Sequence, residues 1–450
     1  MAKFVAVDRD TPFLFPPSVQ EWLPKNHLAR FVVETVEGLD LGELERAYAG
    51  RGSEAFHPAL LLALLIYGYA TGVFSSRKLE RASYDSVAFR YIAANTHPDH
   101  DTINAFRKRF LVQLKPLFVQ VLQIARELGM LKLGTVSLDG SKVHANASRH
   151  SALSWGHANK IEAQLKAEVE ELLRLAERAD QAELPDGMSI PEELALREKR
   201  LGAIAQAKQK IAERAAVRAA EERAAYEAKV RAREQKRAAG KKPRGRDPQP
   251  PQPGPKDTDQ VNLTDEDSRI MKVADGGFDQ TYNVQAAVDI QSRLLVGQDL
   301  SQAPNDRQQL EPMLDELGAL PEALGKVEAL LADAGYSSGH NIECCEAAQI
   351  TPYIAARKES HHAPLLERFR GPGPLQAGAD ALVRTQHRLH TPEGKALYAQ
   401  RKSTIEPVFG IIKQVMGFRQ FLLRGLEKVR GEWTLVCLAY NMKRMCVLAG

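Results

Sequence analysis

Three acidic residues lie where the ends of separate strands and helices can bring side chains together. Asp139 falls late in the expected strand TVSLDGSKV, and Asp333 directly follows the apolar strand ALLA. Glu406 precedes a proline that restricts it to a first helical turn or a kink. Open α/β sheets bind ligands at the carboxyl ends of their strands. If the three carboxylates converge, they would hold one or two Mg²⁺ ions with open positions for phosphate oxygens and water.

Each acid also has a purely local explanation. Asp139 before Gly140 fits a turn, and Asp333 fits a cap of the loop that follows it. Ser403 and Glu406 have the spacing of a helix capping box, which would explain Glu406 without any chemistry. It is the combination of the three acids that favours a metal site over these local explanations.

Basic residues flank Glu406 on both sides. Lys413 lies seven residues later, near the same helix face two turns on, and Arg401 and Lys402 precede Glu406. Cations beside a carboxylate site can hold phosphates on either side of a scissile bond. We therefore expect Lys413, with Arg401 or Lys402, to hold phosphate groups beside the acids, although each of them alone is also typical of a protein surface.

The composition is that of an ordinary folded protein, with 44% apolar and 26% charged residues among 450. It excludes wholesale disorder, collagen and membrane classes. The longest apolar stretch, residues 59–74, is too short to span a bilayer and predicts a buried helix. The start of the chain has no visible export signal, and its four cysteines form neither a disulfide framework nor a zinc-type spacing. We therefore expect a cytoplasmic location.

The net charge of +4 conceals a strongly basic segment. Residues 197–246 contain 17 Lys and Arg against six Glu, whereas the rest of the chain is acidic by seven charges. A basic arm on an acidic body predicts an extended polyanion such as nucleic acid as partner, and a solvated helix face is the alternative. The candidate DNA contacts in this arm are Arg231, Arg233, Lys236, Arg237, Lys241, Lys242, Arg244 and Arg246.

The first 130 residues predict a helical domain. Asn104, Arg107 and Lys108 near the start of its last helix are compatible with a DNA-reading helix-turn-helix, and the pattern equally fits a plain helical bundle. The proline in the linker 95–101 should end one helix, and Asp101 can cap the next. Helices are expected at residues 60–69, 76–94 and 102–130, after a capping box at 18–21.

The remaining pattern alternates strands and helices and is interrupted once. Two long helical stretches, 157–180 and 192–239, predict a helical hairpin inserted after the first strand, and the Pro-rich segment 241–255 predicts an exposed linker. With the insert set aside, the order is that of a single mixed α/β domain. Further strands are expected at 270–273, 282–289, 294–300, 327–332 and 352–355, with helices at 306–317 and 340–348.

With these residues in view, nearly the whole chain resembles the bacterial insertion-sequence transposases of the DDE class. The surroundings of Asp139, Asp333 and Glu406 look like those of the family's first Asp, second Asp and Glu. The family-like strings are FLFPPS from Phe13, HPA from His57, YGYATG from Tyr67, SSRKLE from Ser75, HPDHDTI from His97, DGSK from Asp139, NDRQQL from Asn305, ADAGY from Ala332 and EPVFG from Glu406.

One part of the family pattern is altered in this chain. The family often shows Tyr, Arg, Glu and Lys separated by two, three and six residues. Glu406 and Lys413 keep the six-residue gap, whereas Lys402 occupies the arginine position and is separated from Tyr398 by three residues. Arg401 is therefore expected to do the work of the family arginine from a neighbouring position.

The resemblance implies a DNA transposase that binds the inverted-repeat ends of its element, cuts there and joins the exposed 3′-hydroxyls to target DNA. It implies catalysis and metal binding by Asp139, Asp333 and Glu406 with two Mg²⁺ ions, for which Mn²⁺ is the expected substitute. It further implies a homodimer on double-stranded DNA, no membrane or small-molecule substrate, and a nucleoid-associated location. The alternatives are a domesticated DNA-binding protein without chemistry and a nuclease without a joining step.

The expected fold is α/β, a ribonuclease-H-like mixed sheet with a long helical hairpin inserted after its first strand, preceded by an all-α N-terminal domain. The expected segments are the helical domain at 1–130, the first catalytic strand at 131–156, the insert and linker at 157–260, the rest of the catalytic domain at 261–430 and a C-terminal helix at 431–450.

Overall fold

The computed structural model describes residues 18–48, 55–178, 189–240, 243, 245–273, 276–355, 372–376 and 378–450. The chain divides into two compact units, Met1–Asn146 together with Met271–Gly450, and Ala147–Ile270. This division differs from the five segments expected from the sequence, and those segments stay a prediction.

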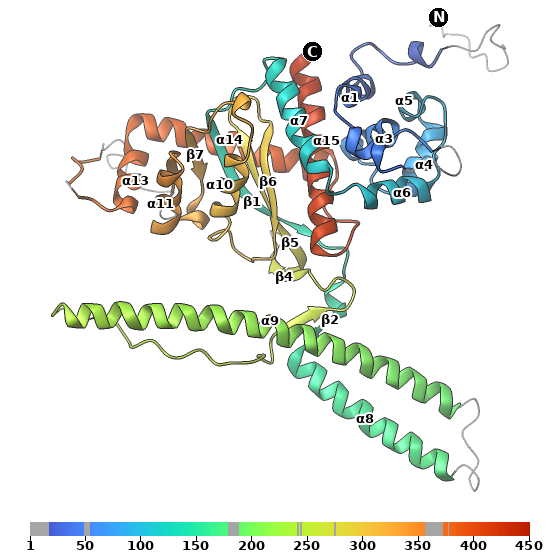
Figure 1. Cartoon of the computed structure of the whole chain (residues 1–450), viewed down its shortest axis with the longest axis vertical. Helices are drawn as coiled ribbons and strands as arrows, with labels where there is room; N and C mark the ends of the chain where they lie inside the picture. Colours follow the sequence, from blue (N-terminus) through green and yellow to red (C-terminus); the bar gives the residue numbers. More distant parts are fainter. Residues whose placement is uncertain are drawn as a thin grey trace, which may run out of the picture. The chain divides into compact units, whose positions relative to one another are not determined.

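The first unit is built on a mixed sheet with the strand order β4-β5-β1-β7-β8, in which β6 also pairs with β5 (Figure 1). β1 pairs antiparallel with β5 and parallel with β7, β5 pairs antiparallel with β6, and β7 pairs parallel with β8. This is the ribonuclease-H-like arrangement predicted above. The strands are β1 (Thr135–His144), β4 (Arg269–Lys272), β5 (Phe278–Asp289), β6 (Leu295–Ser301), β7 (Ala329–Ala332) and β8 (Thr351–Ile354).

Helices cover this sheet and complete its core. α10 and α15 pack against β6, α14 packs against β1 and β5, and α11 and α13 pack against β8. Strands β5 and β7 are almost wholly buried, as expected for strands covered on both faces. The helices are α10 (Leu310–Gly318), α11 (Gly339–Ala347), α13 (Ala381–His390), α14 (Pro392–Gly410) and α15 (Leu426–Ala449), with 3-10 turns η3 (Glu322–Leu324) and η4 (Ala334–Tyr336).

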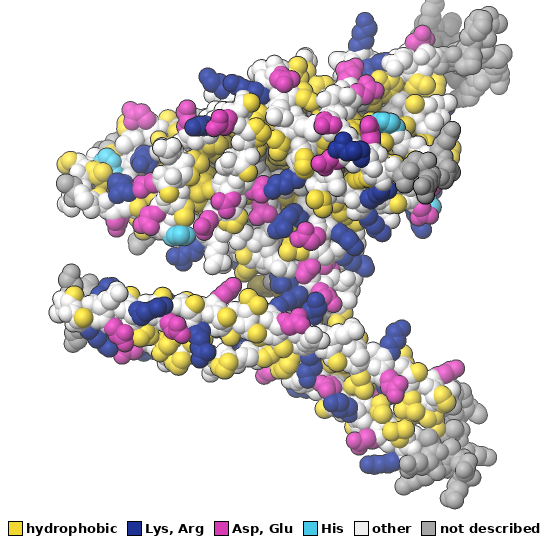
Figure 2. Space-filling view, viewed as in Figure 1, with side chains coloured by type: hydrophobic (Ala, Val, Ile, Leu, Met, Phe, Trp, Pro, Cys, Tyr) yellow, Lys and Arg dark blue, Asp and Glu magenta, His cyan; other side chains and the backbone are white. Residues whose placement is uncertain are grey.

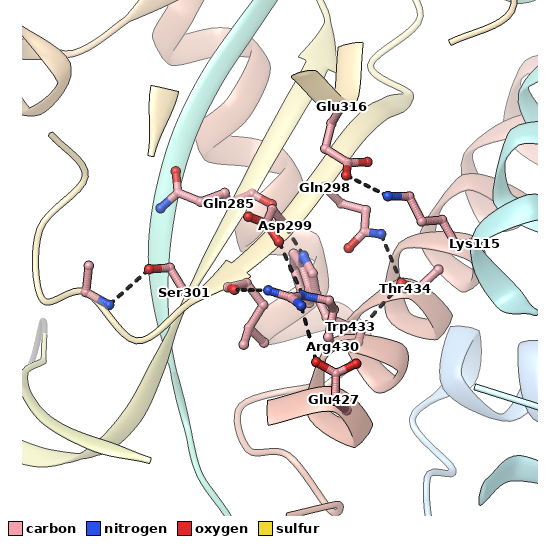
Figure 3. A network of polar contacts seen from close by, with 12 residues as sticks. Lys115, Gln285, Gln298, Asp299, Ser301, Glu316, Glu427, Arg430, Trp433 and Thr434 are labelled. Atoms are coloured by element: carbon pink, nitrogen blue, oxygen red, sulfur yellow. Dashed lines mark hydrogen bonds and ion pairs between the residues drawn. The ribbon is translucent and has the colours of Figure 1, made fainter. Parts of the chain in front are cut away.

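Polar contacts tie β6 and the neighbouring helices together (Figure 3). Arg430 of α15 pairs with Asp299 of β6 at 3.4 Å. Lys115, on a helix of the N-terminal region, pairs with Glu316 of α10 at 2.6 Å. Burial raises the pKa of the Asp299 carboxyl, and the positive charge of Arg430 opposes that shift. An ion pair therefore compensates the partly buried acid on this strand.

The N-terminal helices pack directly on the sheet's C-terminal helix. α3 is buried on nearly all sides and packs against α1 and α15, while α7 also packs against α15. These elements are η1 (Val19–Glu21), α1 (Leu28–Glu37), α2 (Gly42–Arg46), α3 (Pro58–Thr71), α4 (Ser76–Asp85), α5 (Val87–Ile92), α6 (His100–Arg109) and α7 (Leu114–Glu127). Within the described ranges no single helix is long and apolar enough to cross a bilayer, and α3 and α4 pass that test only as a pair bent by 95°.

Several boundaries in this region differ from the prediction. The helices expected at 76–94 and 102–130 are each broken in two, the first because Ser86 adopts an extended backbone with φ −111° and ψ 124°. Asp99 rather than Asp101 caps α6, accepting from the Thr102 backbone N–H at 2.7 Å. The capping box at Ser18 starts only a 3-10 turn, and α1 begins later, at Leu28.

The second unit is a helical hairpin closed by two short strands. α8 (Trp155–Arg178) packs against α9 (Ile190–Ala238), and β2 (Ala152–Ser154) pairs antiparallel with β3 (Gln260–Asn262). Its small core contains Leu153, Ala158, Leu165, Ile204, Ala207, Ile211 and Val261. The buried residues of α9 end at Ala215, so the rest of this helix is largely exposed. A 3-10 turn, η2 (Arg149–Ser151), precedes β2.

Candidate active site

Asp139 and Asp333 emerge from neighbouring strands at the same level. The parallel pairing of β1 and β7 ends with Leu138 opposite Ala332, and the two aspartates are the next residues on their chains. The two carboxylates are close enough to interact, because the charge of Asp333 helps to raise the pKa of Asp139. The structure therefore brings these two predicted site residues together at the carboxyl end of β7.

The environment of Asp139 disfavours its charge. Burial raises the pKa of its carboxyl to about 6, the Arg401 guanidinium opposes the shift, and the charge of Asp333 adds to it. Its Oδ1 accepts from the Gly140 backbone N–H at 2.8 Å, and its Oδ2 accepts from Arg401 Nη1 at 3.0 Å. A second cation at this position would relieve the repulsion between the two aspartates.

Glu406 reaches the same arginine from inside a helix. Its Oε1 lies 3.8 Å from Arg401 Nη2, and its side chain is 55% exposed. The expectation that Glu406 opens a helix is wrong, because α14 starts at Pro392, is capped by Thr391, and continues through Pro407. The Ser403 capping explanation fails for the same reason. Arg401 therefore links the first and third acids through one guanidinium.

Lys413 lies beside β1 on the turn that follows α14. This turn, η5 (Ile411–Val415), is a single stretch of π-helix, a conformation often found at functional sites. Lys413 Nζ donates to Ser141 Oγ at 2.6 Å and to the Lys142 carbonyl at 2.9 Å. Burial lowers the pKa of Lys142, and the charges of Asp306 and Asp139 oppose that shift. Lys142 is thus a further cation of the site that the sequence prediction missed.

Arg401, rather than Lys402, faces the acids. The Arg401 side chain is 11% exposed and bonded to Asp139, whereas Lys402 is exposed to solvent. Tyr398, one turn earlier, donates to the Ala332 carbonyl at 3.3 Å, immediately before Asp333. The altered spacing in this part of the chain therefore still delivers an arginine to the site.

The predicted DNA contacts outside the sheet differ in accessibility. Arg107 is only 6% exposed and donates to the Tyr69 hydroxyl and the Phe74 carbonyl, so its prediction as a DNA contact is wrong. Asn104 is half-buried and accepts from Arg107, while Lys108 is exposed.

The basic arm on α9 and its linker keeps most of its cations in solvent. Arg231, Lys236, Arg237 and Arg246 are exposed. Arg233 is half-buried and pairs with Asp247 at 3.0 Å, an acid that also pairs with Arg237. Lys241, Lys242 and Arg244 lie outside the described residues.

Asp306 is a further acid that the prediction did not assign to the site. Its Oδ1 accepts from Asn283 Nδ2 at 2.7 Å and from Gln285 Nε2 at 2.8 Å. It packs over Gly140, since a Cβ there would come within 2.4 Å of that oxygen. The Tyr336 hydroxyl donates to Gln285, which connects this group to the turn after Asp333. In the sequence, Asp306 is marked only as part of the family-like string NDRQQL.

The donor set fits a hard divalent cation, although the three acids are not closely clustered. All three supply carboxylate oxygens, the ligands preferred by Mg²⁺. Among the described residues, three His, Cys, Asp or Glu ligand atoms come within 4.8 Å of one another only at Glu311, His340 and Cys344. The three acids are therefore spaced more widely, with Arg401 between Asp139 and Glu406.

Fold and site together define a ribonuclease-H-like protein of the DDE class. Residues 256–442 match the family described as Transposase DDE domain, and residues 17–109 match the family described as Transposase domain (DUF772). Together the two matches cover more than half of the chain, and the chain belongs to the DDE transposases. The first match includes Asp333 and Glu406 and begins after Asp139. Neither a curated protein nor a solved structure matches the chain.

Proposed function

We propose that this protein binds the inverted-repeat ends of an insertion sequence and catalyses metal-dependent cleavage and transfer of their strands. The observation that carries the proposal is that Asp333, at the carboxyl end of β7, lies beside Asp139 in the middle of β1, which is bonded to Arg401, within a chain matched by two transposase families. Metal-dependent phosphoryl transfer on DNA is the chemistry that the family implies.

Asp139, Asp333 and Glu406 are the proposed metal ligands, for two Mg²⁺ ions or for Mn²⁺ in their place. When bound, the ions would activate the attacking oxygen and stabilise the leaving one in an in-line displacement at phosphorus. Water attacks in the cleavage step and a DNA 3′-hydroxyl attacks in the transfer step. The carboxylates would hold the ions in place, and no covalent link between protein and DNA is needed.

Arg401 has a distinct part in this proposal. In the structure its guanidinium bonds to Asp139 at 3.0 Å and lies 3.8 Å from Glu406, so one positive charge contacts two of the three acids. Closure of the three acids on a cation requires that the guanidinium give up part of these contacts. Arg401 is then free to donate in a bidentate fashion to a DNA phosphate, the anion that its planar geometry matches.

Lys413 is the second proposed phosphate contact, beside Ser141 on the same strand as Asp139. Lys402, exposed on α14, would meet DNA further from the acids. Asn104, Lys108 and the exposed cations of the arm are proposed to hold the flanking duplex through charge. Pairing of two element ends predicts a homodimer on DNA, in a bacterial, nucleoid-associated setting.

The decisive experiment compares single variants on a labelled element end. D139N, D333N and E406Q should each abolish Mg²⁺-dependent strand cleavage and leave end binding largely intact, because a neutral amide keeps the shape but is a poor ligand for Mg²⁺. E322Q, at an exposed acid on η3, is the matched control and should cleave at the wild-type rate. Retained cleavage by any of the three would remove that acid from the catalytic set.

The same substrates separate the alternatives. A wild-type protein that binds ends but never nicks them with Mg²⁺ or Mn²⁺ would be a domesticated binding protein. A protein that nicks DNA but does not join a 3′-hydroxyl end to a target plasmid would be a nuclease. We expect both cleavage and joined product.

A further inference from the structure

A second group of side chains that could ligate a metal lies on two helices, α10 and α11, and shares no residue with the three acids. His340 and Cys344 are four residues apart on α11 and so share one helix face, and Glu311 reaches them from α10. His340 Nε2 lies 3.5 Å from Glu311 Oε2 and 3.6 Å from Cys344 Sγ. All three ligand atoms lie within 4.8 Å of one another.

These separations match the edges of a tetrahedral zinc site. With Zn–N, Zn–O and Zn–S bonds of about 2.0 to 2.3 Å, tetrahedral geometry places nitrogen about 3.3 Å from oxygen and about 3.6 Å from sulfur. The observed distances of 3.5 and 3.6 Å need almost no rearrangement to reach those values. One imidazole nitrogen is thus already between a carboxylate oxygen and a thiol sulfur.

The local charge also favours a cation. The thiol of Cys344 lies within electrostatic range of three acidic residues, Glu311, Glu343 and Asp315. A bound cation would offset those charges and allow the thiol to release its proton to solvent as it binds. The neighbouring Cys345 is fully buried, so its thiol is not open to solvent beside this group.

The group borders a surface pocket that leaves room for one more ligand. Glu311 and His340 line a pocket of about 540 Å³ together with Arg307, Ser338 and Asn341. Three protein ligands with a fourth position open to water is a common arrangement for zinc. Asn341, on the same helix as His340, donates to the carbonyls of Tyr336 and Arg307, so the pocket adjoins the turn after Asp333.

We propose that Glu311, His340 and Cys344 form a Zn²⁺ site, open to water at its fourth position, that clamps α11 to α10. The site is chemically distinct from the three-acid site, because imidazole and thiolate ligands select zinc whereas carboxylates alone suit Mg²⁺. The zinc proposal does not depend on whether the protein is an active transposase.

Cobalt provides the direct test, because a thiolate bound to Co²⁺ gives an intense charge-transfer absorption that carboxylate ligands cannot give. Full-length, metal-free protein is titrated with Co²⁺ in excess Mg²⁺, which occupies any all-oxygen site. We expect one equivalent of Co²⁺ to produce the thiolate band and Zn²⁺ to displace it. C344S should lose the band, and H340A and E311Q should weaken Zn²⁺ binding at least tenfold. C446S, at the other half-buried cysteine, should keep the band.

Thermal unfolding guards against variants that merely misfold. Without metal, C344S and wild type should melt at similar temperatures, and Zn²⁺ should raise the melting temperature of wild type and C446S but not of C344S. A wild-type protein without a thiolate band, or a C344S protein that keeps the full band, would overturn the proposal. Loss of cleavage with zinc binding intact would count against the proposed function alone.

Discussion

At the scale of single residues, the site is organised by side chains that share one partner. The guanidinium of Arg401 contacts both Asp139 and Glu406. One carboxylate oxygen of Asp306 accepts hydrogen bonds from two side-chain amides of β5. Such sharing means that a substitution at one residue changes the electrostatics of the next. This coupling can be measured through the pH dependence of stability at Asp139 and through the packing of side chains over Gly140.

The raised pKa of Asp139 predicts a pH-dependent cost to stability in metal-free protein. The folded protein holds this proton up to a pKa of about 6, against 3.8 for the ordinary group, so the folded state binds more protons than the unfolded state. Stability contributed by the protonated acid is therefore present below pH 3.8 and is lost as pH rises to 6.

The D139N variant has no carboxyl group to ionise at this position. Its stability relative to wild type should therefore increase as pH rises from 4 to 7. The gain is at most about 3 kcal/mol, since each pKa unit corresponds to about 1.4 kcal/mol. Urea unfolding of both proteins at several pH values, with EDTA present, measures the difference. A difference that stays constant over this range would contradict the burial of Asp139. Adding Mg²⁺ at pH 7 should stabilise wild type more than D139N.

Asp306 and Gln285 occupy the space that a side chain at position 140 would need, so only glycine fits there without a shift. In G140A the new Cβ would lie 2.4 Å from Asp306 Oδ1 and 2.5 Å from Gln285 Nε2, so these groups must move apart. We expect G140A to lose about 1 to 3 kcal/mol of stability and to slow cleavage. G134A, where a Cβ meets nothing within 4 Å, is the matched control and should change little.

A double-mutant cycle identifies the cause. If Asp306 is the obstruction, then D306A should cost less in the G140A background than in wild type, by 0.5 kcal/mol or more. Additive effects of the two substitutions would mean that Gly140 is required for another reason.

At the scale of elements, a buried polar triad joins α3 and α6 of the N-terminal region to α15. The Tyr69 hydroxyl on α3 donates to Glu432 on α15 at 2.7 Å and accepts from Arg107 on α6 at 3.2 Å. Glu432 also accepts the backbone N–H groups of Leu422 and Leu423. Burial raises the pKa of Glu432, and these hydrogen bonds to its carboxylate oppose the shift. Arg107, expected to read DNA, instead stabilises this junction.

Y69F should therefore destabilise the protein without touching the three acids. Removal of the hydroxyl leaves a buried carboxylate and a buried guanidinium with one partner fewer each, which costs about 1 to 3 kcal/mol. Y84F, which removes the hydroxyl of a 55% exposed tyrosine, should stay within about 0.5 kcal/mol of wild type. Chemical denaturation measures both, and equal losses in the two variants would contradict the triad's role.

The sequence pattern predicts the long strands of the sheet and both long helices of the insert because each has many residues with a regular apolar period. It fails where the deciding contact is distant or the element is short. β2 and β3 have three residues each, too few for any period. The start of α14 at Pro392 was missed because the Ser403 pattern imitates a helix start. Glu311 and His340 come together only through the packing of α10 on α11, which no local spacing reveals.

At the scale of the whole molecule, charge is distributed unevenly between body and arm. Figure 2 shows Lys and Arg side chains along the long helix α9, with Asp and Glu interspersed among them. Several of these cations are already paired, such as Arg218, which donates to Asp259 at 2.6 and 2.9 Å. Within the described part of the arm, these pairs leave the exposed, distal cations as the candidates for contacts with DNA phosphates.

Those distal cations should govern the salt dependence of DNA binding. If Arg231, Lys236 and Arg246 each contact one phosphate, neutralising all three in R231Q/K236Q/R246Q should flatten the slope of log affinity against log salt by up to about 2.7, since each released counterion contributes about 0.9. K132Q/K326Q/K428Q removes three exposed lysines from the other unit, with the same change in net charge. Fluorescence anisotropy with a labelled duplex between 50 and 200 mM salt measures both slopes. Because the net charges of the two variants are equal, equal slopes would assign the effect to overall charge and reject the arm as a DNA-binding surface.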